Sequence, residues 1–206
     1  SAQSLASSGY NLYFATFKNT KYISDMHFYY AELLFDMKKY RKASENYVWV
    51  VNNDVKSRYY QKSLLNSILA LEKLLPTKQA ISKVVGKSDE IFEFDDNTKF
   101  FEKVAKEYFI KSKKSSNVID IKYRLAGLYH DHNQLDKALA LYKEITQKYP
   151  KSKYAESSGH SILDIYNKRK DFDGLEAEAK LMLAVPAIAK SKFGGEVRGI
   201  LQRTSF

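Results

Sequence analysis

Apolar residues recur three or four positions apart over most of the chain, which is the spacing of an amphipathic helix. In "YRLAGLYHDHNQLDKALALYKEITQKYP", residues 123–150, two such stripes are separated by the polar stretch "HDHNQ". The same layout of two helical stripes around a short polar turn recurs in residues 25–51 and 161–186. Because two helices joined by a tight turn pack antiparallel, the pattern predicts a series of helix pairs.

Small and aromatic residues occupy fixed places within residues 123–150. Ala126 and Ala138 each fall in the middle of a stripe, where a small side chain lets two antiparallel helices approach closely. Tyr129 and Tyr142 follow them and fill the space beside the contact. Pro150 comes after the second stripe, where it ends a helix.

The same register recurs twice more, each time with a polar turn ("MKKY", "HNQL" or "RKDF") before the second helix. An upstream copy uses Ala31, Tyr40, Ala43 and Tyr47, with Leu34 where an aromatic residue is usual, and a weaker downstream copy uses Ile162, Tyr166, Phe172, Leu175 and Ala179. Three copies in one chain indicate an internal repeat.

A fourth helix pair is interrupted. The segment "SRYYQKSLLNSILALEKLLP", ended by Pro76, has the pattern of a first helix, but the next helical pattern is "NTKFFEKVAKEYFIKS". Residues 77–96 are therefore an insertion, which we expect to be an exposed excursion with a short helix at residues 78–85. Residues 7–18 resemble the second helix of a repeat whose first helix lies outside this sequence.

These registers resemble the tetratricopeptide-repeat superfamily of helix–turn–helix units. The resemblance implies an all-α fold, a right-handed α-α superhelix that forms a solenoid. It divides the chain into a partial repeat (1–20), repeats at 21–57, 58–118 with its insertion 77–96, 119–152 and 153–190, and an extension 191–206. The usual 34-residue period is broken by the insertion and by a spacing of 37 between Tyr129 and Tyr166.

The junctions narrow the resemblance. "QKYPKSKYAESSGHSILDIY" is similar to the junction between repeats in outer-membrane assembly lipoproteins and Tol-Pal accessory proteins, and "ILDIYNKRKDFDGLEAEAKLML" is similar to gliding-motility proteins. The resemblance implies a place in a bacterial cell-envelope or motility complex, periplasmic or outer-membrane-associated, with the signal segment outside this sequence. The chain has no Cys, which fits a reducing cytoplasm equally well.

Charge adds a possible class of partner. The chain has 34 Lys and Arg against 24 Asp and Glu, a net charge of +10. Spread over helix surfaces, this charge is typical of solvated faces, and it suits an anionic envelope polymer. The run "FIKSKKSSN" also resembles a nucleic-acid contact, although basic residues at a helix C-terminus stabilise the helix. No apolar run reaches the roughly 20 residues of a membrane span.

The search for catalytic motifs is negative. The sequence has no H-E-x-x-H, G-x-S-x-G, phosphate-binding loop or dinucleotide turn, so we expect a protein that is not an enzyme and needs no metal or cofactor. His130 and His132 are two apart, and side chains at that spacing on a helix diverge. His160 and Asp164 are four apart and are expected to form a surface pair, and Trp49 is expected to pack in the core.

The expected function is a scaffold that binds a protein or peptide on the concave face lined by the first helix of each repeat. Two alternatives are a nucleic-acid-binding helical repeat and a regulatory domain of a larger enzyme. The aromatic and acidic composition of the face suits a peptide with apolar anchors and some Lys or Arg. Its expected residues are Phe28, Glu32, Phe35, Asp36, Tyr123, Gly127, His130, Asp131, His160, Asp164 and Asn167.

Overall fold

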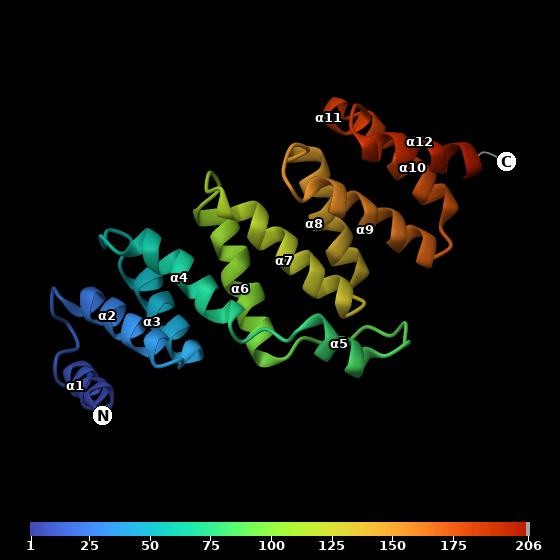
Figure 1. Cartoon of the computed structure of the whole chain (residues 1–206). Helices are drawn as coiled ribbons and strands as arrows, with labels where there is room; N and C mark the ends of the chain where they lie inside the picture. Colours follow the sequence, from blue (N-terminus) through green and yellow to red (C-terminus); the bar gives the residue numbers. More distant parts are fainter. Residues whose placement is uncertain (205–206) are drawn as a thin grey trace. The chain divides into compact units, whose positions relative to one another are not determined.

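The computed structural model describes residues 1–204, and every regular element in this range is an α-helix (Figure 1). None of these helices combines the length and apolar character that crossing a membrane requires. The helices are α1 (Ala2–Thr16), α2 (Ile23–Asp36), α3 (Tyr40–Asn53), α4 (Tyr60–Glu72), α5 (Lys78–Val85), α6 (Asp96–Lys111), α7 (Asn117–Asp131), α8 (Leu135–Lys148), α9 (Ala155–Lys168), α10 (Phe172–Leu183), α11 (Pro186–Ala189) and α12 (Lys192–Thr204).

The helices form two compact units. Unit 1 contains residues 1–77 and 94–113, and unit 2 contains residues 78–93 and the described residues from 114 onward. In unit 1, α2 packs on α1 and α3, and α4 packs on α3 and α6. In unit 2, α7 to α10 pack each on the next, α12 packs on α10, and α5 packs on α7. Helices therefore pack in neighbouring pairs, as the sequence pattern predicts.

The small residues of the predicted register lie at the helix contacts. Ala31 and Ala43 in unit 1 and Ala126 and Ala138 in unit 2 are all 0% exposed. With no side chain beyond Cβ, they allow the two helices of a pair to approach closely. Phe172, in the weaker third copy, is 54% exposed, so this position does not contribute to the core as the register implied.

The turn inside each helix pair has the same backbone geometry. Lys38, Asn133 and Lys170 adopt the left-handed conformation, with φ of 58°, 56° and 56°. In each turn the next residue's N–H donates to a carbonyl five residues earlier, as from Lys39 to Leu34 at 2.8 Å. These bonds satisfy carbonyls at the C-terminus of the first helix. The structure thus repeats one turn three times.

The turns between helix pairs give the repeat length. At the start of each first helix, a backbone oxygen accepts a hydrogen bond from the N–H three residues later. The residues whose oxygens accept are Thr20, Ser57, Ser115 and Ser152. The first two residues are 37 apart in unit 1, and the last two are 37 apart in unit 2. The spacing of 37 found in the sequence is therefore the repeat length of both units.

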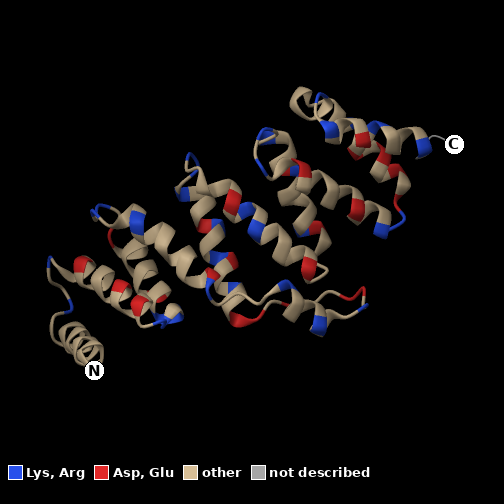
Figure 2. Cartoon of the chain, viewed as in Figure 1, with Lys and Arg blue, Asp and Glu red and all other residues tan. Residues whose placement is uncertain are grey.

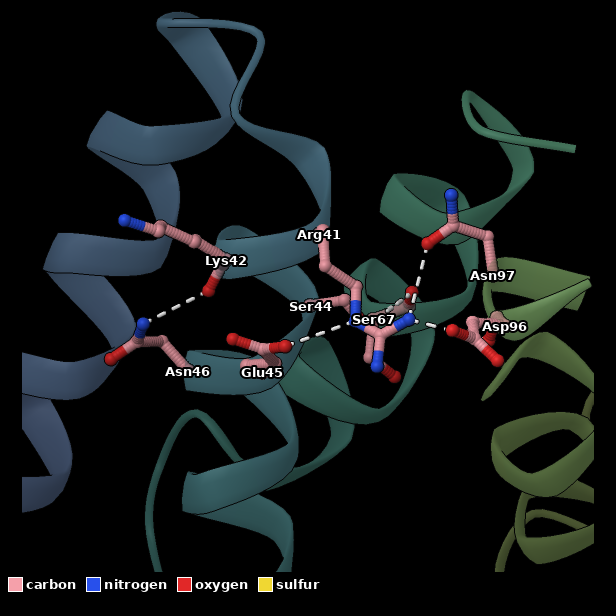
Figure 3. Close-up of polar contacts among 8 residues, drawn as sticks. All are labelled: Arg41, Lys42, Ser44, Glu45, Asn46, Ser67, Asp96 and Asn97. Atoms are coloured by element: carbon pink, nitrogen blue, oxygen red, sulfur yellow. Dashed lines mark hydrogen bonds and ion pairs between the residues drawn. The ribbon is translucent and has the colours of Figure 1, made fainter. Parts of the chain in front are cut away.

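Polar contacts connect α3 to its neighbours in unit 1 (Figure 3). The buried Ser44 hydroxyl donates to the Ser67 carbonyl of α4 at 3.1 Å. The Arg41 guanidinium donates to Asn97 Oδ1 at 3.1 Å and to the Asp96 carbonyl at 3.3 Å, at the start of α6. Because these bonds join α3 to both α4 and α6, they hold the helix pair together across the insertion.

Most residues of the insertion are exposed, as its polar composition suggested, but the segment is also fixed to the rest of unit 2. Its short helix, α5, has the predicted bounds, but Ile81 and Val85 are only 4% and 9% exposed. The following extended segment is fixed to the α7–α8 turn, since the Phe92 N–H donates to the His132 carbonyl at 3.0 Å and Gln134 Nε2 donates to the Phe92 carbonyl at 2.9 Å. Residues 78–93 of the insertion are therefore part of unit 2.

Helix α1 is held to α2 by aromatic rings and by a hydrogen bond between the Ser7 and Tyr30 hydroxyls at 3.0 Å. It contains no charged residue, as Figure 2 shows, and none of its residues is buried. Phe14 stacks on His27 with ring centroids 4.1 Å apart, and His27 stacks on Trp49 at 3.9 Å. His27 Nδ1 also lies 2.7 Å from Asn46 Oδ1. Trp49 is thus a half-buried packing residue, consistent with the sequence prediction.

This stack should make the stability of unit 1 depend on pH. Burial lowers the pKa of His27 below its ordinary value of 6.5, although the bond to Asn46 opposes this shift. The unfolded chain then binds a proton that the folded chain does not, so the free energy of unfolding should be greatest above pH 6.5 and fall as the pH drops through the lowered pKa. The fluorescence of Trp49, the single tryptophan, measures this in urea titrations at about pH 7.5 and about pH 5.5. His27→Phe keeps a flat ring in the stack and should weaken the pH dependence; an unchanged dependence would contradict this role of His27.

Candidate functional site

Side chains from α2 and from α4 and its preceding turn meet in successive pairs in unit 1. Arg58 Nη2 donates to Asp25 Oδ2 at 2.7 Å, and the hydroxyls of Tyr29 and Tyr59 are 2.6 Å apart. The carboxylate, guanidinium and hydroxyl groups near the N-terminal ends of α2 and α4 therefore have hydrogen-bond partners. The Phe28 ring stacks parallel to that of Tyr59 with centroids 4.0 Å apart.

Glu32 forms the central pair. Its Oε1 accepts hydrogen bonds from Asn66 Nδ2 at 3.0 Å and from the Tyr47 hydroxyl, and its Oε2 lies 3.7 Å from Lys62 Nζ. Burial, together with the Glu32 carboxylate, raises the pKa of Tyr47 well above its ordinary value, so the hydroxyl stays protonated and continues to donate. The Glu32 carboxylate is therefore held in place from three sides.

The acidic residue at the C-terminal end of α2, Asp36, has no basic residue of α4 beside it in the same cavity. Asp36 is exposed, and within residues 1–204 no ion-pair partner contacts its carboxylate. Of the two α4 residues that line the same space, Asn66 bonds to Glu32, and Leu69 is 41% exposed. Together with Phe35 and the Glu32–Tyr47–Asn66 cluster, these side chains line a cavity of about 210 Å³, which we call the unit 1 cavity.

The electrostatic character of the unit 1 cavity is negative. Helix α2 carries Asp25, Glu32 and Asp36 and no Lys or Arg, as Figure 2 shows. Asp25 is paired with Arg58 at 2.7 Å, whereas the charge of Asp36 is not matched. A cation that enters the cavity meets Asp36 and finds the apolar surfaces of Phe35 and Leu69 beside it. The cavity can therefore bind a basic side chain that is followed or preceded by an apolar one.

Unit 2 repeats the same pairs 95 positions later. Lys153 Nζ lies 3.3 Å from Asp120 Oδ1, which corresponds to the Asp25–Arg58 pair. Tyr123 stacks on Tyr154 with centroids 4.4 Å apart and meets Tyr142 edge-on at 6.0 Å. Phe28 contacts Tyr59 and Tyr47 in the same two ways, at 4.0 Å and 5.9 Å. The two units are therefore structural copies in this region.

The end of the corresponding helices in unit 2 faces the insertion. His130 and Asp131, together with α5, the loop after it and Lys168, line a cavity of about 360 Å³, the unit 2 cavity. Lys78 Nζ lies 3.8 Å from Asp131 Oδ1, and Lys168 Nζ lies 3.1 Å from Asp89 Oδ1. Burial lowers the pKa of His130, and the nearby Lys78 and Lys168 lower it further against the opposing effect of Asp131.

The expected binding face needs correction at two aromatic positions. Phe28 is 2% exposed and its ring belongs to the core, so it cannot anchor a partner. Tyr123 is half-buried between Tyr142 and Tyr154, so its ring is a packing residue as well. Phe35 is half-buried against Tyr40 and lines the unit 1 cavity, so it alone of these three rings lies at the candidate site.

The expected residues on α9 lie apart from both cavities. His160, Asp164 and Asn167 are exposed. His160 does not pair with Asp164 as expected; its Nε2 lies 3.5 Å from Glu196 of α12 and 3.9 Å from Glu156. Helix α12 also places the Phe193 ring 4.6 Å from the His160 ring, so it covers part of this face.

Three residues of the unit 1 cavity were missed by sequence reasoning. Tyr47 was assigned to packing alone, and Asn66 and Leu69 lie on the first helix of the interrupted repeat, for which no inward positions were derived. Their signal was available, since Asn66 and Leu69 are 34 and 33 residues after Glu32 and Asp36. Because the first helices of neighbouring repeats pack side by side, a residue slightly less than one 37-residue repeat further on is expected to lie opposite a residue of the expected binding face.

No group of three or more His, Asp or Glu side chains within the described range is arranged to hold a metal ion. The unit 1 cavity presents a carboxylate and apolar surface. No protein-family model matches this chain, and a comparison with curated proteins finds no match.

Proposed function

We propose that this protein is a non-enzymatic scaffold that binds a protein or peptide segment through the unit 1 cavity. The observation that carries the proposal is the Asp36 carboxylate, which lies without an ion-pair partner among the described residues beside the exposed Leu69. Asp25, Tyr29 and Glu32 of α2 each have a hydrogen-bond partner on α4 or its preceding turn, namely Arg58, Tyr59 and Asn66. Asp36 is the one residue of this series without such a partner among the described residues.

The size of the cavity supports a side chain as its occupant. At about 210 Å³ it is smaller than the roughly 300–1,000 Å³ of sites that enclose a small molecule. A Lys or Arg side chain can place its cationic end at Asp36 and its aliphatic stem along Phe35 and Leu69. An adjacent apolar residue of the same peptide then packs at the rim.

The repeated turns support a helical-repeat architecture of the tetratricopeptide type. The spacing of 37 residues between successive first helices in each unit, and the same left-handed turn inside three of the helix pairs, are features expected of a solenoid. A right-handed superhelix with this face inward is the architecture that we propose. A place in the bacterial cell envelope depends on the resemblance of the junctions and stays a prediction.

A panel of short peptides tests the function. Fluorescence anisotropy with the full chain should show binding of peptides that combine Lys or Arg with an apolar neighbour, and weaker binding when the basic residue is replaced by Glu. Asp36→Asn should weaken binding about tenfold or more, because a charged hydrogen bond contributes roughly 1.5–3 kcal/mol. Asp54→Asn, the same change outside the cavity, is the matched control.

Two outcomes would contradict the proposal. If all of these peptides bind equally to the wild type and to Asp36→Asn, the cavity is not the binding site. If the chain instead binds single-stranded nucleic acid tightly, and the binding weakens steeply with salt, the basic surface is the functional one and the nucleic-acid alternative is correct.

A further inference from the structure

Helix α2 of unit 1 corresponds to helix α7 of unit 2. The C-terminal end of α7 is covered by another segment of the chain, whereas the C-terminal end of α2 is not. Asp36 and Phe35 of unit 1 correspond, 95 positions later, to Asp131 and His130 of unit 2. The correspondence is structural, because the turns that follow contain the left-handed residues Lys38 and Asn133 with φ of 58° and 56°. In unit 2 this position contacts residues 78–93 of the chain, whereas no described segment of unit 1 takes that place.

The insertion shows how a segment binds at this position. Lys78, the first residue of α5, approaches Asp131 with its ammonium group at 3.8 Å. Ile81 and Val85, three and seven positions later, lie on one face of the helix and are buried. Gly86, with φ of +61°, ends the helix in a conformation that favours glycine.

After the helix, the backbone of the insertion is bound by the turn residues. Asn133 Nδ2 donates to the carbonyls of Ser88 at 2.7 Å and Glu90 at 3.0 Å. Gln134 Nε2 donates to the carbonyl of Phe92 at 2.9 Å. The turn thus supplies side-chain donors to carbonyls that follow the helix.

Unit 1 has a carboxylate and side-chain donors at the corresponding positions, and it has apolar surface where unit 2 has His130 and Asp164. Asp36 supplies the carboxylate, and Phe35 and Leu69 supply apolar surface in the cavity. Lys38 and Lys39 occupy the positions of Asn133 and Gln134, and both are exposed donors. A carboxylate at the N-terminus of a docked helix and two ammonium groups beyond its C-terminus also match the helix dipole.

We propose that the unit 1 cavity binds a short amphipathic helix of a partner protein with the pattern of α5. The helix begins with Lys, carries apolar residues three and seven positions later, and ends at Gly. The inference depends on the proposed function and adds the conformation and register of the segment that is bound. The chain's own insertion does not supply this segment, because its backbone is bonded to the turn of unit 2.

A peptide with the sequence of residues 77–93, "TKQAISKVVGKSDEIFE", is the probe. Labelled and titrated with the full chain, it should bind, and Asp36→Asn should weaken binding about tenfold or more. Asp131→Asn, the same change at the corresponding position of unit 2, should leave binding unchanged. Within the peptide, Ile81→Asp should weaken binding as strongly as Lys78→Glu, whereas a change at Ser82 to Ala should have little effect.

A charge exchange sharpens the assignment. The Asp36→Lys protein should lose binding of the original peptide and regain binding of the Lys78→Asp peptide. Because Asp36 is exposed, these variants should unfold at the same temperature as the wild type, which confirms that the loss is one of binding.

The outcomes separate this inference from the proposed function. If basic peptides without the helical pattern bind in an Asp36-dependent way and the α5 peptide does not, the function stands and the helical register is wrong. If the α5 peptide depends on Asp131 and not on Asp36, it exchanges with the insertion in unit 2, which overturns the inference. Self-association of the chain that disappears in Asp36→Asn would assign the cavity to a second copy and would overturn it as well.

Discussion

Phe193→Ala should lower the free energy of unfolding by about 3–5 kcal/mol, the usual cost of removing a fully buried aromatic side chain. Phe193 is 2% exposed, and its ring lies directly over Gly159 of α9. A Cβ atom at Gly159 would be 2.4 Å from the ring, so the two residues form a tight contact between α12 and α9. Removal of the ring leaves a cavity at this contact that α12 cannot close without moving.

Phe172→Ala is the matched control for this variant. The substitution is the same, but Phe172 is 54% exposed, so the expected loss is within about 0.5 kcal/mol. Urea unfolding followed by far-ultraviolet circular dichroism measures both variants. Equal losses would show that the contact between α12 and α9 does not contribute to stability as the structure indicates.

Ala138→Leu should destabilise the chain by about 1–3 kcal/mol or more. Ala138 is 0% exposed at the contact between α7 and α8, and three additional carbon atoms have no space there unless the helices separate. The corresponding Ala43 in unit 1 is also 0% exposed, so Ala43→Leu should show a similar loss. The midpoint of thermal unfolding measures the effect.

Ala140→Leu makes the same substitution two residues away on α8, at an exposed position, and should change stability little. If Ala138→Leu and Ala140→Leu unfold at the same temperature, the close approach of α7 and α8 is not what stabilises the pair.

Tyr123→Ala should also lower the unfolding temperature, because the ring stacks between Tyr142 and Tyr154. This differs from the result expected for a binding-face residue.

The helices, their pairing and the small residues between them can be predicted from the sequence alone. These features depend on local periodicity, since a helix and its partner lie within one repeat of 37 residues. Ala126 and Ala138 are only 12 positions apart, and the requirement for a small residue at each is set by the antiparallel approach of two adjacent segments. The bounds of α5 were predictable for the same reason, because a short helix depends on its own residues.

Which residues of the expected binding face are accessible depends on contacts between neighbouring repeats. Phe28 and Phe35 are both aromatic residues of α2, but Phe28 is buried by Tyr59, which lies 31 positions later in the next repeat. Asp25 and Asp36 are both acidic, yet one meets Arg58 and the other lines a cavity with Leu69. Such pairs join neighbouring repeats, and their identity depends on the register between helices that are not adjacent in sequence.

The position of the insertion was likewise decided by tertiary structure. Its polar, turn-rich composition is typical of an exposed loop. Most of its residues are exposed, but it is also held by hydrogen bonds between its backbone and the α7–α8 turn, about 40 residues further along the chain. Every residue except Pro carries the same backbone donor and acceptor, so such bonds leave little trace in composition, and only the folded chain shows that the segment covers Asp131 and leaves Asp36 accessible.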